Sequence, residues 1–332
     1  MVDAHDSDEL VAAVREADAA GEPLLVLGGG SNLVVADEGF SGVVVRVRSR
    51  GVERDGARLA VQAGEPWDAL VERTVADGLA GFECLSGIPG LTGATPIQNV
   101  GAYGQDVSDT IVSVRAYDRV SGATADMTPG ECEFGYRTSA FKRTPGRWVV
   151  LAVTFALESR EDSLPIKYPE LARELGVEVG GTAPLRHVRD TVLRIRRGKG
   201  MVIDPADPDS RSAGSFFTNP ILDGDEFARL VERAGERPPA FPEPDGRVKT
   251  SAAWLVEHAG FGRGYGLPGP VAVSPKHSLA LTNRGGATTE QLLALAREIA
   301  DGVHARYAVQ LVPEPVIVGR PDDLRLGAAK AG

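Results

Sequence analysis

The stretch from Ser86 to Asp106, SGIPGLTGATPIQNVGAYGQD, limits the possible folds of this chain most strongly. It is too rich in glycine for an ordinary helix or strand and too apolar for a linker. Its glycines remove Cβ atoms where a backbone must turn through positive φ or approach a ligand closely. Such a loop can direct many backbone N–H groups at one anion, which predicts a cofactor cradle. Glycine content alone would favour the alternative, a long surface loop of a β-rich domain.

A second glycine turn, Gly28-Gly29-Gly30-Ser31-Asn32, follows an apolar strand expected over 24–27. Backbone N–H groups at the end of such a strand can hold a diphosphate. The turn is not a Rossmann fingerprint, because Leu33 stands where G-x-G-x-x-G needs its last glycine, and it lacks the Gly-Lys-Ser/Thr of a P-loop. By itself, the turn is equally compatible with simple punctuation between a strand and a loop.

Composition excludes several classes of function. A net charge of -10 argues against general nucleic-acid binding, because no overall basic field would attract a phosphate backbone. Two cysteines without Cys-x-x-Cys spacing and five scattered histidines predict neither a disulfide framework nor a metal site. We see no signal peptide and no apolar run of membrane-spanning length, so we expect the cytoplasm as the compartment and no membrane insertion.

Hydrophobic periodicity and turn residues predict a mixture of helices and short strands. We expect a helix capped by Ser7, a helix opened by Pro66, a helix from Thr182 and a helix at Thr288 whose capping box is completed by Gln291. The last strand is expected over 311–318. Residues 1 to about 160 therefore suggest an α+β or α/β domain around a mixed sheet.

The helix expected from Thr182 carries the most concentrated positive charge of this acidic chain. Its basic residues are Arg186, Arg189, Arg194, Arg196, Arg197 and Lys199. A solvated helix face is the ordinary interpretation of arginines at helical spacing. A local diphosphate site is the functional interpretation, which we favour only for the end of the run near Lys199.

Seven motifs in one order resemble those of a known family. They are GGGSNLVV from Gly28, GIPGLTGATPIQNVGAYGQD from Gly87, GYRTSAFK from Gly135, GSFFTNP from Gly214, KTSAAWLVEHAGF from Lys249, VSPKHSLALTN from Val273 and VPEPVIVG from Val312. Together they resemble the UDP-N-acetylenolpyruvoylglucosamine reductases, flavoproteins that complete UDP-N-acetylmuramate for bacterial peptidoglycan. Each motif alone is weak, whereas their order over nearly the whole chain makes the resemblance specific.

The resemblance implies an α+β fold with a two-subdomain FAD-binding region of the vanillyl-alcohol-oxidase (PCMH) type and a C-terminal α+β domain that binds the UDP-sugar. The implied boundaries are a first FAD subdomain at 1–52, a second at 53–199 with a substrate loop at 158–182, a substrate domain at 200–312, and a return strand and disordered tail at 313–332. Relatives carry a further segment with a strand before the first helix. We therefore expect the first subdomain to be incomplete at its start.

The resemblance also implies the ligands and their contacts. FAD would be bound tightly and without a covalent bond, NADPH would reduce it, and the chain would be a monomer acting on UDP-N-acetylglucosamine enolpyruvate. The implied FAD contacts are Gly28, Gly29, Gly30, Ser31, Asn32, Gly87, Ile88, Pro89, Gly93, Ala94, Gln98, Asn99, Gly101 and Ala102. The implied substrate contacts are Tyr136, Tyr168, Lys199, Asn219 and His277. Tyr168 would close over the substrate diphosphate, whereas His277 is equally compatible with a packed imidazole.

Three residues match the family's catalytic positions. Arg137 would offer a planar fork to the substrate carboxylate, where negative charge develops as hydride adds to the vinyl carbon. Glu314 would be protonated and donate a hydrogen bond there, which requires a raised pKa in a dry site. Ser215 would protonate the adjacent carbon, since a carbanion-like centre is a strong base.

Two other functions are compatible with the same motifs. One is an FAD-dependent oxidase that uses O2; such oxidases commonly attach FAD through His or Cys, and neither glycine segment contains a histidine. The other is a UDP-sugar-binding paralogue with impaired catalysis. The presence of Arg137, Ser215 and Glu314 argues weakly against that paralogue.

Overall fold

The computed structural model describes residues 1–319, which divide into two compact units. The first unit holds residues 1–30 and 41–197, and the second holds residues 31–40 and those from 198 onward. The chain therefore passes between the units at 30–31, 40–41 and 197–198. The tail predicted at 320–332 lies outside the described residues.

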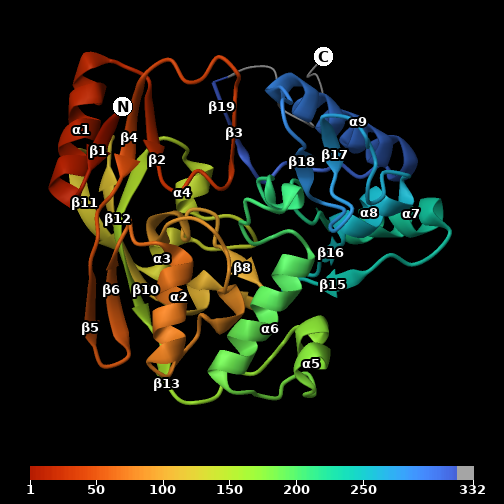
Figure 1. The fold of residues 1–332 in the computed structure, drawn as a ribbon, viewed down its shortest axis with the longest axis horizontal. Helices are drawn as coiled ribbons and strands as arrows, with labels where there is room; N and C mark the ends of the chain where they lie inside the picture. Colours follow the sequence, from red (N-terminus) through yellow and green to blue (C-terminus); the bar gives the residue numbers. More distant parts are fainter. Residues whose placement is uncertain (320–332) are drawn as a thin grey trace. The chain divides into compact units, whose positions relative to one another are not determined.

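The first unit begins with a three-stranded parallel sheet in the order β1-β4-β2, and helix α1 packs against it (Figure 1). Their bounds are β1 Val2–Ala4, α1 Ser7–Ala20, β2 Leu24–Leu27 and β4 Val43–Val47. A strand thus precedes the first helix, and it pairs Val2 with Val45. Asp6, not the predicted Ser7, is the N-cap, because its side chain accepts the Glu9 N–H at 2.8 Å and Ser7 is the first helical residue.

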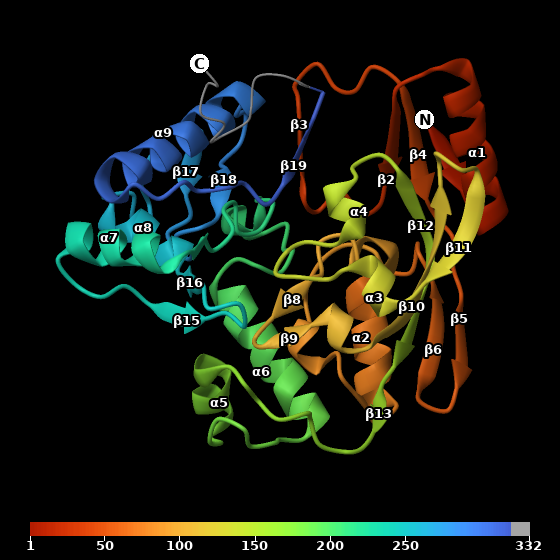
Figure 2. The same ribbon diagram turned by 180° about the vertical axis from the view of Figure 1, so that it is seen from behind.

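A five-stranded antiparallel sheet in the order β11-β10-β12-β6-β5 forms the centre of the first unit (Figure 2). Its strands are β5 Val52–Asp55, β6 Arg58–Gln62, β10 Ile111–Asp118, β11 Ala123–Met127 and β12 Trp148–Ala156. Helix α2 (Trp67–Ala76) follows Pro66 as predicted, with Pro66 as the N-cap rather than the first helical residue. The rings of Trp67, Phe82 and Phe155 pack with centroids 4.8 to 6.1 Å apart, which joins α2 to β12.

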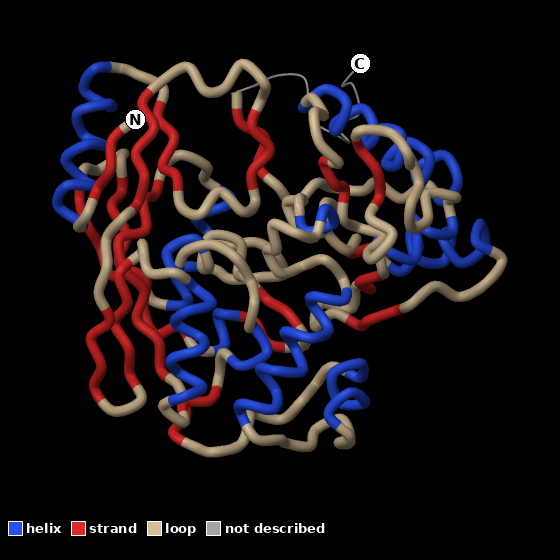
Figure 3. The backbone as a smooth tube through the Cα atoms, viewed as in Figure 1, coloured by secondary structure: helices blue, strands red, loops and turns tan. Residues whose placement is uncertain are grey.

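Short elements surround this sheet, and the segment from 86 to 106 is mostly loop (Figure 3). They are β7 Leu79–Ala80, which pairs with β13 Glu158–Ser159; β8 Gly101–Ala102, which pairs with β9 Gln105–Asp106; the 3-10 helices η1 Glu83–Leu85, η2 Thr92–Ala94 and η3 Val107–Asp109; and helices α3 Pro129–Cys132 and α4 Ala140–Arg143.

Helices α5 (Pro169–Leu175) and α6 (Leu185–Gly198) complete the first unit. They share a small core that contains Leu171 of α5 and Val188 of α6 together with Cys84. Helix α6 begins at Leu185 and not at the predicted Thr182. Val188, Val192 and Ile195 of α6 face this core, whereas Leu185 of the same helix packs in the core beside the five-stranded sheet.

The second unit combines short strands with three helices around one core. Its elements are β3 Leu33–Val35, η4 Pro208–Ser210, β14 Ile221–Leu222, α7 Gly224–Ala234, β15 Ala240–Pro242, β16 Val248–Thr250, α8 Ala252–His258, β17 Val271–Val273, β18 Leu281–Asn283, α9 Thr289–Tyr307 and β19 Val316–Val318. The predicted capping box of Thr288 and Gln291 is present at α9. The last strand is shorter than predicted, because only residues 316–318 pair, in parallel with β3, beyond two prolines that lack an N–H.

No helix within residues 1–319 is long and apolar enough to cross a membrane.

Candidate functional site

The two glycine segments of the first unit meet backbone to backbone. A Cβ atom added to Gly29 would lie 2.7 Å from the Cα atom of Gly90, so a larger residue would not fit without backbone movement. Gly30 and Gly90 have φ angles of +69° and +115°. The sequence predicted that both segments hold one cofactor, and this close contact places them side by side.

The backbone donors of this glycine cradle are suited to an anion. Within residues 1–319, the N–H groups of Gly29, Gly30, Gly90 and Leu91 donate to no acceptor in the protein. In contrast, the N–H groups of the following turn are bonded inside the protein, as when Gly93 donates to Ala63 O at 2.8 Å. Unbonded N–H groups from two adjoining segments are what the diphosphate of FAD requires, so the residues present fit that cofactor.

The other predicted FAD contacts of this region have different surroundings. Gly87 donates its N–H to Asp68, and Ile88 and Pro89 follow it half-buried. Gly93 packs against Ala63, the residue after β6, since a Cβ there would lie 2.5 Å from Ala63 Cβ, whereas Ala94 is exposed. Gly28 has more room, because its nearest neighbour would be Leu91 Cδ1 at 3.8 Å. The predicted contact Gln98 is half-buried on the same loop.

Arg137 is attached to the end of the same loop. Its Nη1 donates to Asn99 O at 3.2 Å, its Nη2 donates to Gly101 O, and Asp106 Oδ1 lies 3.7 Å from Nη1. The guanidinium also lies 5.2 Å from the ring centroid of Tyr136. The structure thus brings the predicted catalytic Arg137 and the predicted substrate contact Tyr136 to the loop that contains the predicted FAD contacts Asn99, Gly101 and Ala102.

Two non-glycine residues of this site have left-handed backbone. Arg137 has φ +53° and Asn99 has φ +46°, a conformation that costs free energy for residues with a Cβ. The buried side chain of Asn99 holds its own backbone in place, since its Oδ1 accepts the Ser108 N–H and its Nδ2 donates to Gly135 O, both at 3.1 Å. Strain that is maintained by neighbouring contacts is common where a side chain must be aimed.

The predicted substrate residue Tyr168 contacts a tyrosine that the sequence analysis missed. Tyr168 precedes α5 and is 41% exposed, and its ring meets Tyr103 edge-on with centroids 5.5 Å apart. Tyr103 belongs to the glycine loop and has φ +50°. Burial raises the pKa of Tyr103 to about 12, although Arg196 acts in the opposite direction. The predicted substrate loop therefore contacts the predicted cofactor loop through two aromatic rings.

The second unit brings together Ser215, His277 and Glu314. Ser215 Oγ lies 3.2 Å from His277 Nε2. The Glu314 N–H donates to Phe216 O at 2.8 Å, so Glu314 is held beside the residue that follows Ser215. Asn32, predicted as an FAD contact, joins this group, because its Nδ2 lies 3.4 Å from Glu314 O and its own carbonyl accepts the Val316 N–H. Ser31 and Asn32 belong to this unit, whereas Gly28, Gly29 and Gly30 belong to the first.

Two predicted substrate contacts lie elsewhere in the second unit. Lys199 follows α6 and is half-buried. Asn219 supports the start of α8, since its Oδ1 accepts the Ala252 N–H at 2.9 Å. The predicted contact of Asn219 with a ligand stays a prediction.

Sequence reasoning also missed an ion pair that supports the glycine loop. Arg189 of α6 donates to both carboxylate oxygens of Asp68 on α2, at 2.7 and 3.1 Å, and Asp68 Oδ1 also accepts the Gly87 N–H at 2.6 Å. The prediction of a solvated helix face is wrong for Arg189, because it is only 7% exposed. Burial alone would raise the pKa of Asp68, but the hydrogen bonds from Arg189 and Gly87 outweigh it and the net pKa is lowered.

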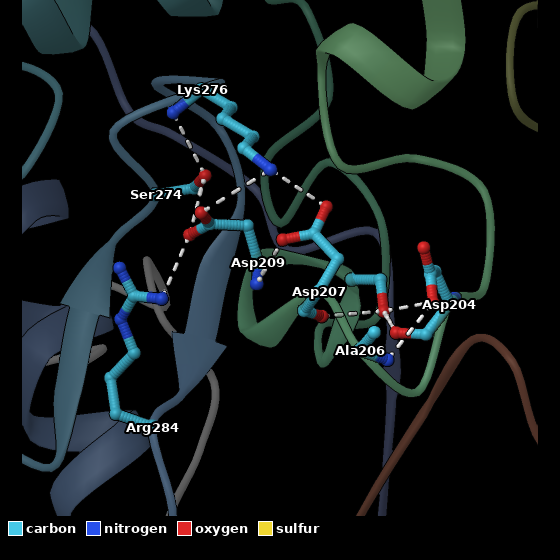
Figure 4. Close-up of polar contacts among 8 residues, drawn as sticks. Asp204, Ala206, Asp207, Asp209, Ser274, Lys276 and Arg284 are labelled. Carbon is cyan, nitrogen blue, oxygen red and sulfur yellow. Dashed lines mark hydrogen bonds and ion pairs between the residues drawn. The ribbon is translucent and has the colours of Figure 1, made fainter.

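A partly buried ionic cluster, which we call the Asp209 cluster, lies in the second unit and was also missed. It consists of Asp207, Asp209, Ser274, Lys276 and Arg284 (Figure 4). Lys276 directly precedes the predicted substrate residue His277. Within residues 1–319, no group of three or more His, Cys, Asp or Glu side chains is arranged to hold a metal ion.

Two family models match different parts of the chain. A family model described as FAD binding domain matches residues 1–127, and one described as UDP-N-acetylenolpyruvoylglucosamine reductase, C-terminal domain, matches residues 205–318. These matches confirm the fold class predicted from the sequence.

Curated relatives match over nearly the whole chain. The UDP-N-acetylenolpyruvoylglucosamine reductase of Thermobifida fusca (strain YX) is 59% identical over 324 residues, which covers 94% of this chain and 90% of the relative. The protein of the same name from Streptomyces coelicolor is 59% identical over 318 residues, covering 94% of this chain and 83% of the relative.

A solved structure is also similar. The crystal structure of UDP-N-acetylenolpyruvylglucosamine reductase from Thermus caldophilus has a TM-score of 0.64 and 25% sequence identity, and the match covers 95% of this chain and 91% of that chain.

Proposed function

Because this chain belongs to the UDP-N-acetylenolpyruvoylglucosamine reductase family, whose members are FAD-dependent oxidoreductases of peptidoglycan synthesis, we propose its reaction in detail. It reduces the enolpyruvyl group of UDP-N-acetylglucosamine enolpyruvate to the lactyl ether of UDP-N-acetylmuramate, with NADPH as the reductant. The chemistry that FAD supplies when bound is hydride transfer, from NADPH in the first half-reaction and to the vinyl CH2 carbon in the second. Gly29, Gly30, Gly90 and Leu91 would hold its diphosphate through their N–H groups.

Arg137 binds the substrate carboxylate in this proposal. A guanidinium carries five N–H donors, so its bonds to the carbonyls of Asn99 and Gly101 are compatible with a further bond to a carboxylate. Those two bonds orient the planar group before substrate arrives. A preoriented cation lowers the energy of the negative charge that develops on the carboxylate, and no reorganisation is needed during the reaction.

Ser215 supplies the proton and Glu314 supplies a hydrogen bond in this proposal. The observation that carries the proposal is the bond from the Glu314 N–H to Phe216 O at 2.8 Å, since it aligns two segments that are far apart in the sequence. Ser215 and Glu314 therefore lie on neighbouring chain segments, which supports a shared role for them. Ser215 gives its proton to the carbon next to the carboxylate, and Glu314 donates a hydrogen bond to the developing enolate-like charge.

Separate measurement of the two half-reactions tests these roles. In Ser215→Ala, NADPH should reduce the flavin at nearly the normal rate, whereas reoxidation by the enolpyruvyl substrate should slow by about 100- to 10,000-fold. Thr218→Ala removes a hydroxyl from the same segment, where it makes only a 3.4 Å contact with Val312 O, and should leave both rates nearly unchanged. Equal losses of rate in both half-reactions of Ser215→Ala would show that Ser215 is not the proton donor.

The remaining expectations stay predictions. They are non-covalent FAD, NADPH in preference to NADH, a monomer and a cytoplasmic location.

A further inference from the structure

We propose that His277 is a positioning residue for Ser215. Its Nε2–H donates a hydrogen bond to Ser215 Oγ, directs the hydroxyl proton away from the ring, and returns a proton to the oxygen after transfer. The inference rests on the proposed function, which makes Ser215 the proton donor. It replaces the two interpretations that the sequence left open for His277, a ligand contact and a packed imidazole.

The distance between the two side chains determines their roles. Ser215 Oγ and His277 Nε2 are 3.2 Å apart, within hydrogen-bonding range, and both residues are half-buried. A hydroxyl has one proton and two acceptor lone pairs. If that proton is to reach a substrate carbon, it cannot also point at the imidazole, so Oγ must accept and Nε2 must carry the proton of this hydrogen bond.

The proton transfers balance in this arrangement. A C–H bond forms at the enolate-like carbon as the Ser215 O–H bond breaks, and the electron pair of that bond stays on Oγ. The Nε2–H bond of a protonated His277 then breaks as the O–H bond forms again, which leaves a neutral imidazole. Solvent returns a proton to the ring, so each turnover takes one proton from water, as the overall reduction by NADPH requires.

The Asp209 cluster fixes the turn that carries His277 (Figure 4). Ser274 Oγ donates to Asp209 Oδ1 at 3.1 Å and accepts the Lys276 N–H at 3.0 Å. The Lys276 ammonium lies 2.8 Å from Asp207 Oδ2, and Arg284 Nη1 lies 3.0 Å from Asp209 Oδ1. Lys276, the residue next to His277, is thus held at its backbone by Ser274 and at its ammonium by Asp207.

Backbone bonds align the His277 turn with the Ser215 segment. The Phe216 N–H donates to Leu279 O at 2.7 Å, and the Ala280 N–H donates to His277 O at 3.1 Å. Phe216 and Phe217 are each only 2% exposed, which anchors the chain directly after Ser215. These bonds and buried rings hold both segments in place, and they thereby fix the 3.2 Å distance between Ser215 Oγ and His277 Nε2.

Half-reaction kinetics of the FAD-loaded chain test the proposal. His277→Ala should slow reoxidation of the flavin by the enolpyruvyl substrate by about 10- to 100-fold, the effect of losing one hydrogen bond to a developing charge. The same variant should change the rate of flavin reduction by NADPH by less than about twofold, because His277 supports only the later proton transfer. His277→Gln keeps an N–H donor but cannot release a proton, so its rate should lie between those of the wild type and His277→Ala. His304→Ala, on the exposed side of α9, serves as the matched control and should change neither rate.

A double variant separates this proposal from the proposed function. In a Ser215→Ala background, His277→Ala should cause no further loss, because the proton that His277 supports is gone. Independent, multiplicative losses would overturn the proposal, as would equal slowing of both half-reactions by His277→Ala. If reoxidation were intact in His277→Ala and abolished in Ser215→Ala, only the role of His277 would be overturned. If reoxidation were intact in both variants, the role of Ser215 as proton donor would be overturned as well.

A spectroscopic measurement that does not depend on activity completes the test. In the holoprotein labelled with 15N-histidine, the Nε2 signal assigned through His277→Gln should be that of a protonated nitrogen, and Ser215→Ala should shift it. An unprotonated Nε2 that accepts from Ser215 would overturn the proposal.

Discussion

Replacing Asp68 with asparagine should weaken both the fold of the first unit and its binding of FAD. Asp68 Oδ1 accepts from Arg189 and from the Gly87 N–H, and Oδ2 accepts from the second guanidinium nitrogen. Asparagine keeps the size but removes the charge and replaces one acceptor with an NH2 group. If its oxygen takes the place of Oδ1, its NH2 group faces Nη2 of Arg189, which places two donors against each other.

The magnitude follows from the exposure of the two groups. Removing one partner of a fully buried ion pair costs about 3 to 5 kcal/mol, and the Arg189 side chain is 9% exposed. The Asp68 side chain is 38% exposed, so water screens part of the interaction. We therefore expect a loss of about 2 kcal/mol in the free energy of unfolding. Release of Gly87 should lower FAD affinity by about tenfold, or about 1.4 kcal/mol.

Acidification should reproduce the loss in the wild type. The net pKa of Asp68 is lowered in the fold, so the native state binds fewer protons there than the unfolded chain. Its contribution is present at neutral pH and disappears as the pH falls below the ordinary carboxyl value of about 4. The difference in stability between wild type and Asp68→Asn should therefore narrow below about pH 4.

Urea unfolding and titration of the apoprotein with FAD measure the two effects. Asp77→Asn is the matched control, because Asp77 follows the same helix and pairs with Arg54 at 2.8 Å, but both of those side chains are more than a third exposed. Its cost should be below about 1 kcal/mol, with unchanged FAD affinity. Equal effects of the two substitutions, or no effect of Asp68→Asn, would show that the Asp68–Arg189 pair does not support the glycine loop.

Four further substitutions test the glycine contact, the buried Glu83 and the binding role of Tyr168. Gly29→Ala should lower FAD affinity by at least about tenfold, because its Cβ would lie 2.7 Å from Gly90 Cα. Gly28→Ala, whose Cβ would lie 3.8 Å from its nearest neighbour, should lower the affinity less. Equal losses of affinity in apoprotein titrations would contradict the contact between Gly29 and Gly90. Glu83→Gln should lower the free energy of unfolding in urea by about 2 kcal/mol, because the buried carboxylate accepts hydrogen bonds from Gly81, Gln105 and Leu164. A change below about 0.5 kcal/mol would disprove a stabilising role for these bonds. Tyr168→Phe keeps the ring contact with Tyr103 and removes only the hydroxyl. It should raise KM for the UDP-sugar about fivefold with little change in kcat, because one hydrogen bond to the substrate is lost. A loss of kcat alone would contradict a binding role.

Local features of the sequence predicted much of the fold. The capping box of Thr288 and Gln291 marks the start of α9, because both partners lie within one helical turn. Pro66 likewise marks the start of α2, because it directly precedes the first helical residue, Trp67. The seven motifs identified the family because they are contiguous and keep one order along the chain.

Contacts between distant residues could not be predicted. Residues 33–35 pair with 316–318, and Asp68 pairs with Arg189, yet neither partner's local pattern identifies the other. Glu83 is a similar case, because a glutamate beside a glycine loop gives no sign of complete burial. The role inferred for His277 likewise depends on a contact with Ser215 across 62 positions.

Anaerobic mixing of the NADPH-reduced holoprotein with UDP-N-acetylglucosamine enolpyruvate tests the proposed reaction in a single turnover. We expect the oxidised flavin absorbance to return without oxygen and UDP-N-acetylmuramate to form in an amount equal to the flavin reoxidised. A flavin that stays reduced until air is admitted would contradict it.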